Sequence, residues 1–298
     1  METPALRFAA PAPADAPRVR ELARKAMGSD LSFANIYLLQ KKYLTTIAIH
    51  GGHLFRHFAG SERLRGYAFP CGEGDTAEAL ELLREHAKAH GRELRFCLLT
   101  EEQRHLLEAY FPGQYTYHTD PGDADYLYRQ ADLAELPGTA YHAKRSHISK
   151  FEREHPDARF EILSPHNTQH ALAVAHGWLQ AQPGDSPALQ HEARAIENAL
   201  QHAEELGIFG GLLYVGGAPV AMSLGSGISE SVADIHYEKC LPDMRGAYPL
   251  INREMARHLS HYTLINREED LNYPGLRQAK LSYHPSLVLH KYSAIPVC

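Results

Sequence analysis

A stretch of 24 residues without a charged side chain, residues 206–229, constrains the fold more than any other segment. An uncharged stretch of this length can cross a bilayer as a helix or be buried inside a folded domain. It contains seven glycines and Pro219, and the pair Gly216-Gly217 divides it into two short apolar runs. Two apolar runs around a two-residue glycine turn are typical of a β-hairpin. We therefore expect a buried hairpin and no membrane span.

The first half of the chain repeats this signal at Gly51-Gly52, between β-prone runs at 45–50 and 53–58. In both halves the hairpin precedes a strand, a helix, a strand, a helix and a final strand, as apolar spacing and capping residues such as Asp75 and Thr100 indicate. We also expect a helix at 31–42, before the first hairpin, and the last strand of the chain at 287–293. Sequence identity between the halves is negligible, so only the pattern repeats. We expect a mixed α/β protein with two similar domains, at 29–130 and 131–298, after a lead-in at 1–28.

Composition narrows the function classes. The chain has 30 Lys plus Arg against 36 Asp plus Glu, a net charge of −6, which argues against a DNA-binding protein but not against a local basic patch. The four cysteines are scattered and form no CxxC pair. With no signal-peptide pattern in the first 30 residues, we expect a cytoplasmic protein. His50, His53 and His57 flank a hairpin turn without a nearby carboxylate or cysteine, and no other group suggests metal ligands, so we expect no metal site in the chain.

The loop from Pro242 to Tyr248 lies between a strand expected at 232–238 and a helix expected at 248–260. A strand that leads through small residues into a helix directs backbone N–H groups and the positive end of the helix dipole at one point. Arg245 adds donors, and Gly246 and Ala247 leave room for a phosphate. Together with Tyr248 they form a candidate phosphate loop, although a plain strand–helix turn has the same pattern.

The order of these elements resembles the GNAT acyltransferase superfamily, whose phosphate loop reads Gln/Arg-x-x-Gly-x-Gly/Ala; the loop here has one glycine fewer. From about residue 30 onward the chain more specifically resembles the phosphatidylglycerol lysyltransferase C-terminal-domain family in its soluble, stand-alone form. The segments that carry this resemblance are 141–151, His236-Tyr237-Glu238-Lys239, 246–252, 265–271 and 275–285.

The resemblance implies tandem GNAT domains like those of the Fem-type peptidyltransferases. It also implies no tightly bound cofactor and an aminoacyl-tRNA donor whose acceptor end binds the protein. The acceptor would be an amine or hydroxyl of a lipid headgroup, a peptide or a small molecule. The membrane flippase region of the lipid enzyme is absent from this sequence. Two alternatives stay open: an N-acyltransferase that uses acyl-coenzyme A, and a non-catalytic tandem-GNAT module that binds a metabolite or a partner protein.

Two residues are candidates for catalysis. Acyl transfer needs a base near the attacking group and an acid for the leaving group. Glu238, at the end of the strand before the phosphate loop, has the position of a base, and a salt bridge to Lys239 or another neighbour is its alternative. By the resemblance, Tyr283 is the acid that protonates the leaving group; its alternative is a packed tyrosine with a satisfied hydroxyl.

Polar side chains near the ends of the later strands are candidates for substrate binding, since ligands often lie at the carboxyl ends of strands in α/β folds. Amides would hold a substrate amide or carboxylate, acidic groups an α-ammonium, and basic groups a phosphate or carboxylate. A solvated turn or helix face is the alternative for each. The candidates are Asn252, Asn266, Glu269, Asp270, Lys280, Lys144 and Arg145.

Overall fold

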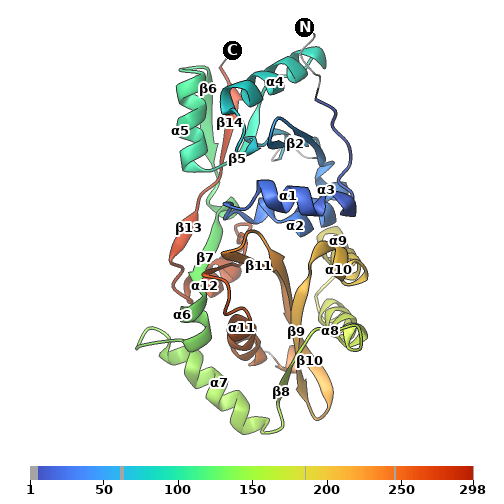
Figure 1. Cartoon of the computed structure of the whole chain (residues 1–298). Coiled ribbons are helices and arrows are strands. Elements are labelled where there is room, and N and C mark those ends of the chain that lie inside the picture. Colours follow the sequence, from blue (N-terminus) through green and yellow to red (C-terminus); the bar gives the residue numbers. More distant parts are fainter. Residues whose placement is uncertain (1–5, 61–63, 185, 245, 298) are drawn as a thin grey trace.

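The computed structural model describes residues 6–60, 64–184, 186–244 and 246–297. Two β-sheets lie one above the other along the long axis of the molecule, and helices α1 (Ala16–Leu22) and α2 (Phe33–Leu38) lie between them (Figure 1). Each sheet combines antiparallel pairs with one parallel pair, β3–β5 in the first and β11–β12 in the second. The predicted mixed α/β architecture is confirmed.

The first sheet has the strand order β1-β2-β3-β5-β14-β6, with β4 paired to β2. The predicted hairpin is present, since His50 pairs with His53 and both intervening glycines have positive φ. Two helices cover this sheet, and each begins at its predicted cap, Asp75 or Thr100. The elements are β1 (Thr46–His50), β2 (His53–Phe58), β3 (Gly66–Tyr67), β4 (Cys71–Gly72), α4 (Thr76–Ala89), β5 (Phe96–Leu99), α5 (Glu101–Tyr110) and β6 (Tyr115–Thr119).

The second sheet has the order β13-β7-β12-β11-β10-β9-β8. The uncharged stretch forms β9 and β10, where Leu212, Leu213 and Met222 are almost fully buried, so the buried hairpin is confirmed. One helix, α11, covers one face of this sheet, and α8 and α9 cover the other (Figure 1). The strands are β7 (Asp125–Arg129), β8 (Arg159–Ile162), β9 (Phe209–Val215), β10 (Ala218–Gly227), β11 (Val232–Cys240), β12 (Leu264–Asn266) and β13 (Leu287–Leu289).

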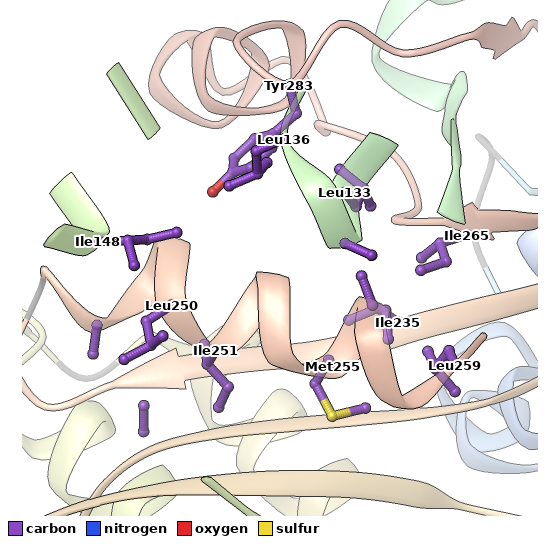
Figure 2. Close-up of a cluster of buried hydrophobic side chains, with 14 of the residues drawn as sticks. Leu133, Leu136, Ile148, Ile235, Leu250, Ile251, Met255, Leu259, Ile265 and Tyr283 are labelled. Carbon is purple, nitrogen blue, oxygen red and sulfur yellow. The ribbon is translucent and has the colours of Figure 1, made fainter. Parts of the chain in front are cut away.

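The hydrophobic core beneath α11 joins this helix to the sheet and to α6 and α7; Figure 2 shows Leu250, Ile251 and Met255 of α11 in the same cluster as Ile235 and Tyr283. No helix in the described ranges combines the length and the apolar character that a membrane crossing needs. The remaining helices are α3 (Gln40–Tyr43), α6 (Gln130–Glu135), α7 (His142–Glu154), α8 (Thr168–Gln180), α9 (Pro187–Gln201), α10 (Ala203–Leu206), α11 (Ala247–His258) and α12 (Pro274–Leu281).

The sheets do not follow the expected division at residue 130. The strand β7, expected to close the first half, pairs with β12 and β13 in the second sheet. In the other direction, β14 (Tyr292–Pro296) returns to the first sheet and inserts between β5 and β6. The single last strand expected at 287–293 is in fact two strands, one in each sheet. Local apolar patterns identify strands, whereas the pairing partner depends on contacts between distant segments.

Candidate functional site

The predicted catalytic residues Glu238 and Tyr283 lie on the same side of the second sheet, with Arg267 between them. The Nη2 of Arg267 donates a hydrogen bond to Oε1 of Glu238 at 3.0 Å, and the guanidinium lies 5.0 Å from the centre of the Tyr283 ring. Burial raises the pKa of the Tyr283 phenol, so the hydroxyl stays protonated at neutral pH. The geometry therefore gathers both predicted residues around one buried cation.

The Glu238 carboxylate has two partners in this nearly buried position. Besides Arg267 it accepts a hydrogen bond from Nδ2 of Asn252 at 3.3 Å. The Oδ1 of Asn252 is buried and has no hydrogen-bond partner within the described part of the chain. Lys239, considered as a salt-bridge partner for Glu238, pairs instead with Glu192 at 2.7 Å. Both oxygens of the Glu238 carboxylate are therefore engaged by donors of the protein.

The candidate phosphate loop leads into α11 as expected. Gly246 is the N-cap of this helix and Ala247, fully buried, its first residue. Tyr248 is half-buried against the core, and burial raises the pKa of its phenol to about 12. Arg245 lies outside the described residues. A Cβ at Gly246 would lie 3.3 Å from Cδ2 of Phe151, so the helix start is closely packed. The positive end of the helix dipole lies at this turn.

A strained turn at residues 267–272 follows β12. Glu268, Leu271 and Asn272 all have φ between 53° and 61°, the left-handed region that favours glycine. Lys280 stabilises the turn through its backbone. Its Nζ donates hydrogen bonds to the carbonyl oxygens of Glu268 at 2.9 Å and Glu269 at 2.6 Å, and also to that of Arg267. Burial lowers the pKa of Lys280 to about 8. The predicted phosphate ligand Lys280 is thus engaged with backbone, where it positions the turn.

Two other predicted ligands have their polar atoms engaged inside the protein. Asn266 donates from Nδ2 to Met27 O and to Asp125 Oδ2, both at 2.9 Å, and its Oδ1 accepts from the Glu268 N–H. The carboxylate of Asp270 accepts from the Tyr126 hydroxyl and from two nitrogens of Arg277. Although burial opposes its charge, Arg277 and Tyr126 hold the pKa of Asp270 at about 2. Neither residue presents a free group to a substrate.

The two basic residues predicted on α7 also make internal contacts. Lys144 Nζ donates to Ser282 Oγ at 2.7 Å and lies 3.9 Å from the centre of the Tyr283 ring. Burial lowers its pKa. Arg145 Nη1 donates to the carbonyl oxygens of Leu136 and Gly138 and so closes the end of α6. Of this pair, Lys144 belongs to the Glu238–Tyr283 region, and Arg145 does not.

A cavity of about 690 Å³ lies between the first sheet and the strained turn. Its wall on the first sheet is largely apolar, with Phe58, Phe96 and Leu98. Its opposite end carries Glu268 and Glu269 from the turn, and Asp30, Asn35 and Lys291 also line it. Glu269 is the only predicted substrate ligand among the described lining residues. We call this space the interdomain cavity.

The acidic end of the interdomain cavity is only partly neutralised. Lys291 pairs with Asp125 at 2.6 Å and lies 3.9 Å from Asp30, which also accepts from Arg56 at 2.8 Å. Burial, reinforced by the charge of Glu268, raises the pKa of Glu269 to about 7, although Lys291 acts against this shift. The turn thus brings two carboxylates to a cavity whose described lining also includes the basic residues Lys42, Arg65, Arg95 and Lys291.

Sequence reasoning missed a second cluster, which adjoins the cavity. Asp234 and His236 of β11 meet Glu268 of the turn, and one ligand atom from each lies within 4.8 Å of the other two. His236 Nδ1 is 2.9 Å from Glu268 Oε1 and 3.5 Å from Asp234 Oδ2. The one signal in the sequence was the spacing Asp-x-His, which places two ligands on one face of a regular strand.

Comparisons with known proteins identify the family and the fold of the chain. The family model described as "Phosphatidylglycerol lysyltransferase, C-terminal" matches residues 22–295. An uncharacterised protein of Mycoplasmoides gallisepticum is 25% identical over 180 residues, which are 58% of this chain. The chain spans about half the length of that curated relative, since the match covers 56% of it.

Solved structures share the whole fold. A conserved protein of unknown function from Bacteroides thetaiotaomicron is 34% identical over 98% of this chain and all of that one, with a TM-score of 0.92. The L-PGS structure from Bacillus licheniformis has a TM-score of 0.67 at 15% identity, over 99% of this chain and 93% of that one. FemX has a TM-score of 0.64 at 9% identity, over 97% of both chains. The predicted tandem GNAT fold of the Fem type is thereby confirmed.

Proposed function

The chain belongs to the phosphatidylglycerol lysyltransferase C-terminal family, and from that premise we propose that it is an aminoacyltransferase. The aminoacyl group would pass from aminoacyl-tRNA to an acceptor bound in the interdomain cavity. The observation that carries this proposal is the cavity itself, which ends in carboxylates at the turn beside the Glu238–Arg267–Tyr283 group. Donor and acceptor would meet at residues 267–269.

The acidic end of the interdomain cavity favours an amine over a hydroxyl acceptor. An amine arrives largely as an ammonium ion, which carboxylates attract, and two carboxylates of the turn, Glu268 and Glu269, face the space where it would lie. The apolar wall of Phe58, Phe96 and Leu98 accommodates the body of such a molecule. A peptide amine, a lipid headgroup amine and a small amine all share this chemistry.

Transfer requires the ammonium to lose a proton before its nitrogen attacks the ester carbonyl. We assign this proton to Glu269, which lines the cavity, rather than to Glu238, which Arg267 holds in an ion pair. The new C–N bond forms as the C–O bond to the tRNA ribose breaks. The departing oxygen takes up a proton, and the nitrogen loses its second proton as the amide forms, which restores the group that protonated the departing oxygen. Tyr283, a protonated phenol beside two cations, is the proposed donor of that proton.

The contact between Arg267 and Glu238 also helps to identify the donor substrate. The pairing of β11 with β12 ends at Asp234 and Asn266, where β12 ends and the turn begins. An open slot between splayed strands would favour acyl-coenzyme A, but here an ion pair at 3.0 Å joins β11 to the turn. This supports aminoacyl-tRNA over acyl-coenzyme A as the donor.

The test uses the purified full chain with radiolabelled aminoacyl-tRNAs charged from a mixture of amino acids, and ethanolamine and hydroxylamine as small acceptors. We expect label to move from tRNA to the amine, and Glu269→Gln to slow transfer by about 100-fold or more. The matched control is Glu102→Gln, which changes an exposed carboxylate at the start of α5. This variant should catalyse transfer at the wild-type rate. Glu238→Gln distinguishes the two candidate bases: if Glu269 is the base, this variant should slow transfer much less than Glu269→Gln does.

Two results would contradict the proposal. Transfer from acetyl-coenzyme A but not from aminoacyl-tRNA would establish the acyl-coenzyme A alternative. Turnover with neither donor, by protein whose fold is intact, would leave the non-catalytic binding module.

A further inference from the structure

The cluster of Asp234, His236 and Glu268 has the dimensions of a metal site. Bonds of about 2.1 Å to nitrogen and oxygen place neighbouring ligand atoms roughly 3.0–3.5 Å apart in octahedral or tetrahedral coordination. His236 Nδ1 lies 2.9 Å from Glu268 Oε1 and 3.5 Å from Asp234 Oδ2. One cation can therefore contact all three groups with little movement of the side chains.

Two irregularities of the backbone build this cluster. The pairing of β10 with β11 passes from Gly225↔Ile235 to Leu224↔Tyr237, so His236 is an extra residue in a β-bulge. The bulge brings the His236 ring to the Asp234 carboxylate. Glu268, in turn, has a φ of 58°, in the left-handed region that favours glycine. Both irregularities involve residues whose side chains converge at one point.

The surrounding side chains fit a metal-bound histidine. Ser226 Oγ lies 2.9 Å from His236 Nε2, and Ser32 Oγ lies 2.9 Å from Ser226 Oγ. A histidine that binds a metal through Nδ1 keeps its proton on Nε2, and the Ser226 oxygen can accept that hydrogen bond. Asn35 Nδ2 donates to Asp234 Oδ2 at 3.2 Å and to Glu268 Oε1 at 2.8 Å, which fixes the other two ligands.

The carboxylates of this cluster favour a bound cation. Asp234 is fully buried, and its Oδ1 has no hydrogen-bond partner among the residues that the structure describes. A divalent ion would compensate the buried carboxylate of Asp234 and that of Glu268, which lies on the other side of His236 Nδ1.

We propose that Asp234, His236 and Glu268 bind a first-row divalent cation of the Zn²⁺ class. One nitrogen and two carboxylates suit such an ion, and three protein ligands leave a coordination position for water or a ligand. Glu268 and Asn35 both line the interdomain cavity, so the ion enters from there and its open position faces it. The site stands on these contacts alone and does not depend on the proposed aminoacyl transfer.

The test is calorimetric titration of the chelator-treated full chain with Zn²⁺, and with Co²⁺ as a spectroscopic probe of nitrogen and oxygen ligands. We expect one ion per chain, with Co²⁺ absorption that Zn²⁺ displaces. His236→Ala and Asp234→Asn should each weaken binding by about 100-fold or more. Glu268→Gln, at the partly exposed edge of the cluster, provides the same test where a buried substitution unfolds the protein.

The matched control is His176→Ala. His176 forms an exposed pair with Glu197 at 3.0 Å, a histidine and one carboxylate without a second carboxylate, and its removal should leave binding unchanged. The proposal is overturned if the folded wild-type chain binds no stoichiometric ion at millimolar concentration. It is equally overturned if the folded Glu268→Gln variant binds as tightly as wild type.

Discussion

The guanidinium of Arg267, in the turn that follows β12, lies 3.0 Å from the carboxylate of Glu238 on β11. Both side chains are largely buried, with 15% and 10% of their surfaces exposed. Each charge therefore depends on the other, because water solvates neither well. The pair is a structural link between β11 and the turn after β12, and it fixes the position of Tyr283 beneath it.

Removal of one member of this pair should destabilise the protein. Glu238→Ala leaves the Arg267 charge buried without a partner, and we expect the free energy of unfolding to fall by about 3 kcal/mol. Urea denaturation measures this change. The double variant Glu238→Ala/Arg267→Met should recover part of the loss, since no unpaired charge remains. Independent, additive effects of the two substitutions would show that the pair contributes no coupling.

Asp270 should be a stabilising residue rather than a ligand. Asp270→Asn removes the charge that Arg277 contacts through two nitrogens and that Tyr126 contacts through its hydroxyl. We expect a loss of about 2–3 kcal/mol at pH 7, measured by urea denaturation. Asp243→Asn, on an exposed turn, should cost little. A variant of wild-type stability that fails to bind substrate would assign Asp270 to the ligand instead.

His86 should make the protein sensitive to acid. Burial, and then the charges of His90 and Arg92, lower the pKa of His86 to about 4, below the value near 6.5 of the unfolded chain. The unfolded state therefore binds more protons below pH 6.5, so the stability that the neutral ring provides is lost as the pH falls from 6.5 toward 4.

The variant His86→Gln should lose about 2 kcal/mol less than wild type between pH 7 and pH 4.5 in denaturation experiments. His142→Gln, an exposed histidine, serves as the control and should follow the wild-type curve. Equal acid sensitivity of wild type and His86→Gln would contradict the assigned direction of the shift.

The strand β14 should be essential to the first sheet. Deletion of residues 290–298 exposes the edges of β5 and β6 and removes the fully buried Ala294. We expect rapid hydrogen exchange throughout β5 and β6 and loss of the cooperative unfolding of this half. Deletion of residues 297–298 alone keeps β14 and should preserve slow exchange. Protection of β5 and β6 in the longer deletion would show that the first sheet forms without β14.

Local signals predicted the elements best where a specific residue marks a boundary. The two Gly-Gly hairpins and the capped starts of α4 and α5 are confirmed. In contrast, β6 was not predicted, although Tyr115–Thr119 alternates aromatic and polar side chains as a half-exposed strand does. The helix expected at 31–42 is divided into α2 and α3, and Leu44 ends it with positive φ.

The site shows the same limit. Glu238 and Tyr283 were predicted as the base and the acid of one site, and both contact Arg267 in the fold. No sequence pattern distinguishes Arg267, the cation between them. The interdomain cavity joins residues such as Phe96 and Glu269, which are distant in sequence. The His236 bulge changes which face a side chain occupies, and alternation along a strand does not reveal such an extra residue.

The insertion of β14 between β5 and β6 also determines when the protein can fold during its synthesis. Translation delivers β5 and β6 early, whereas their shared partner leaves the ribosome only after more than half of the chain has followed. Until then the first sheet presents two open edges, which other chains can pair with. We therefore expect the first sheet to be completed only when β14, near the C-terminus, has been synthesised. Until then we expect the nascent chain to depend on chaperones.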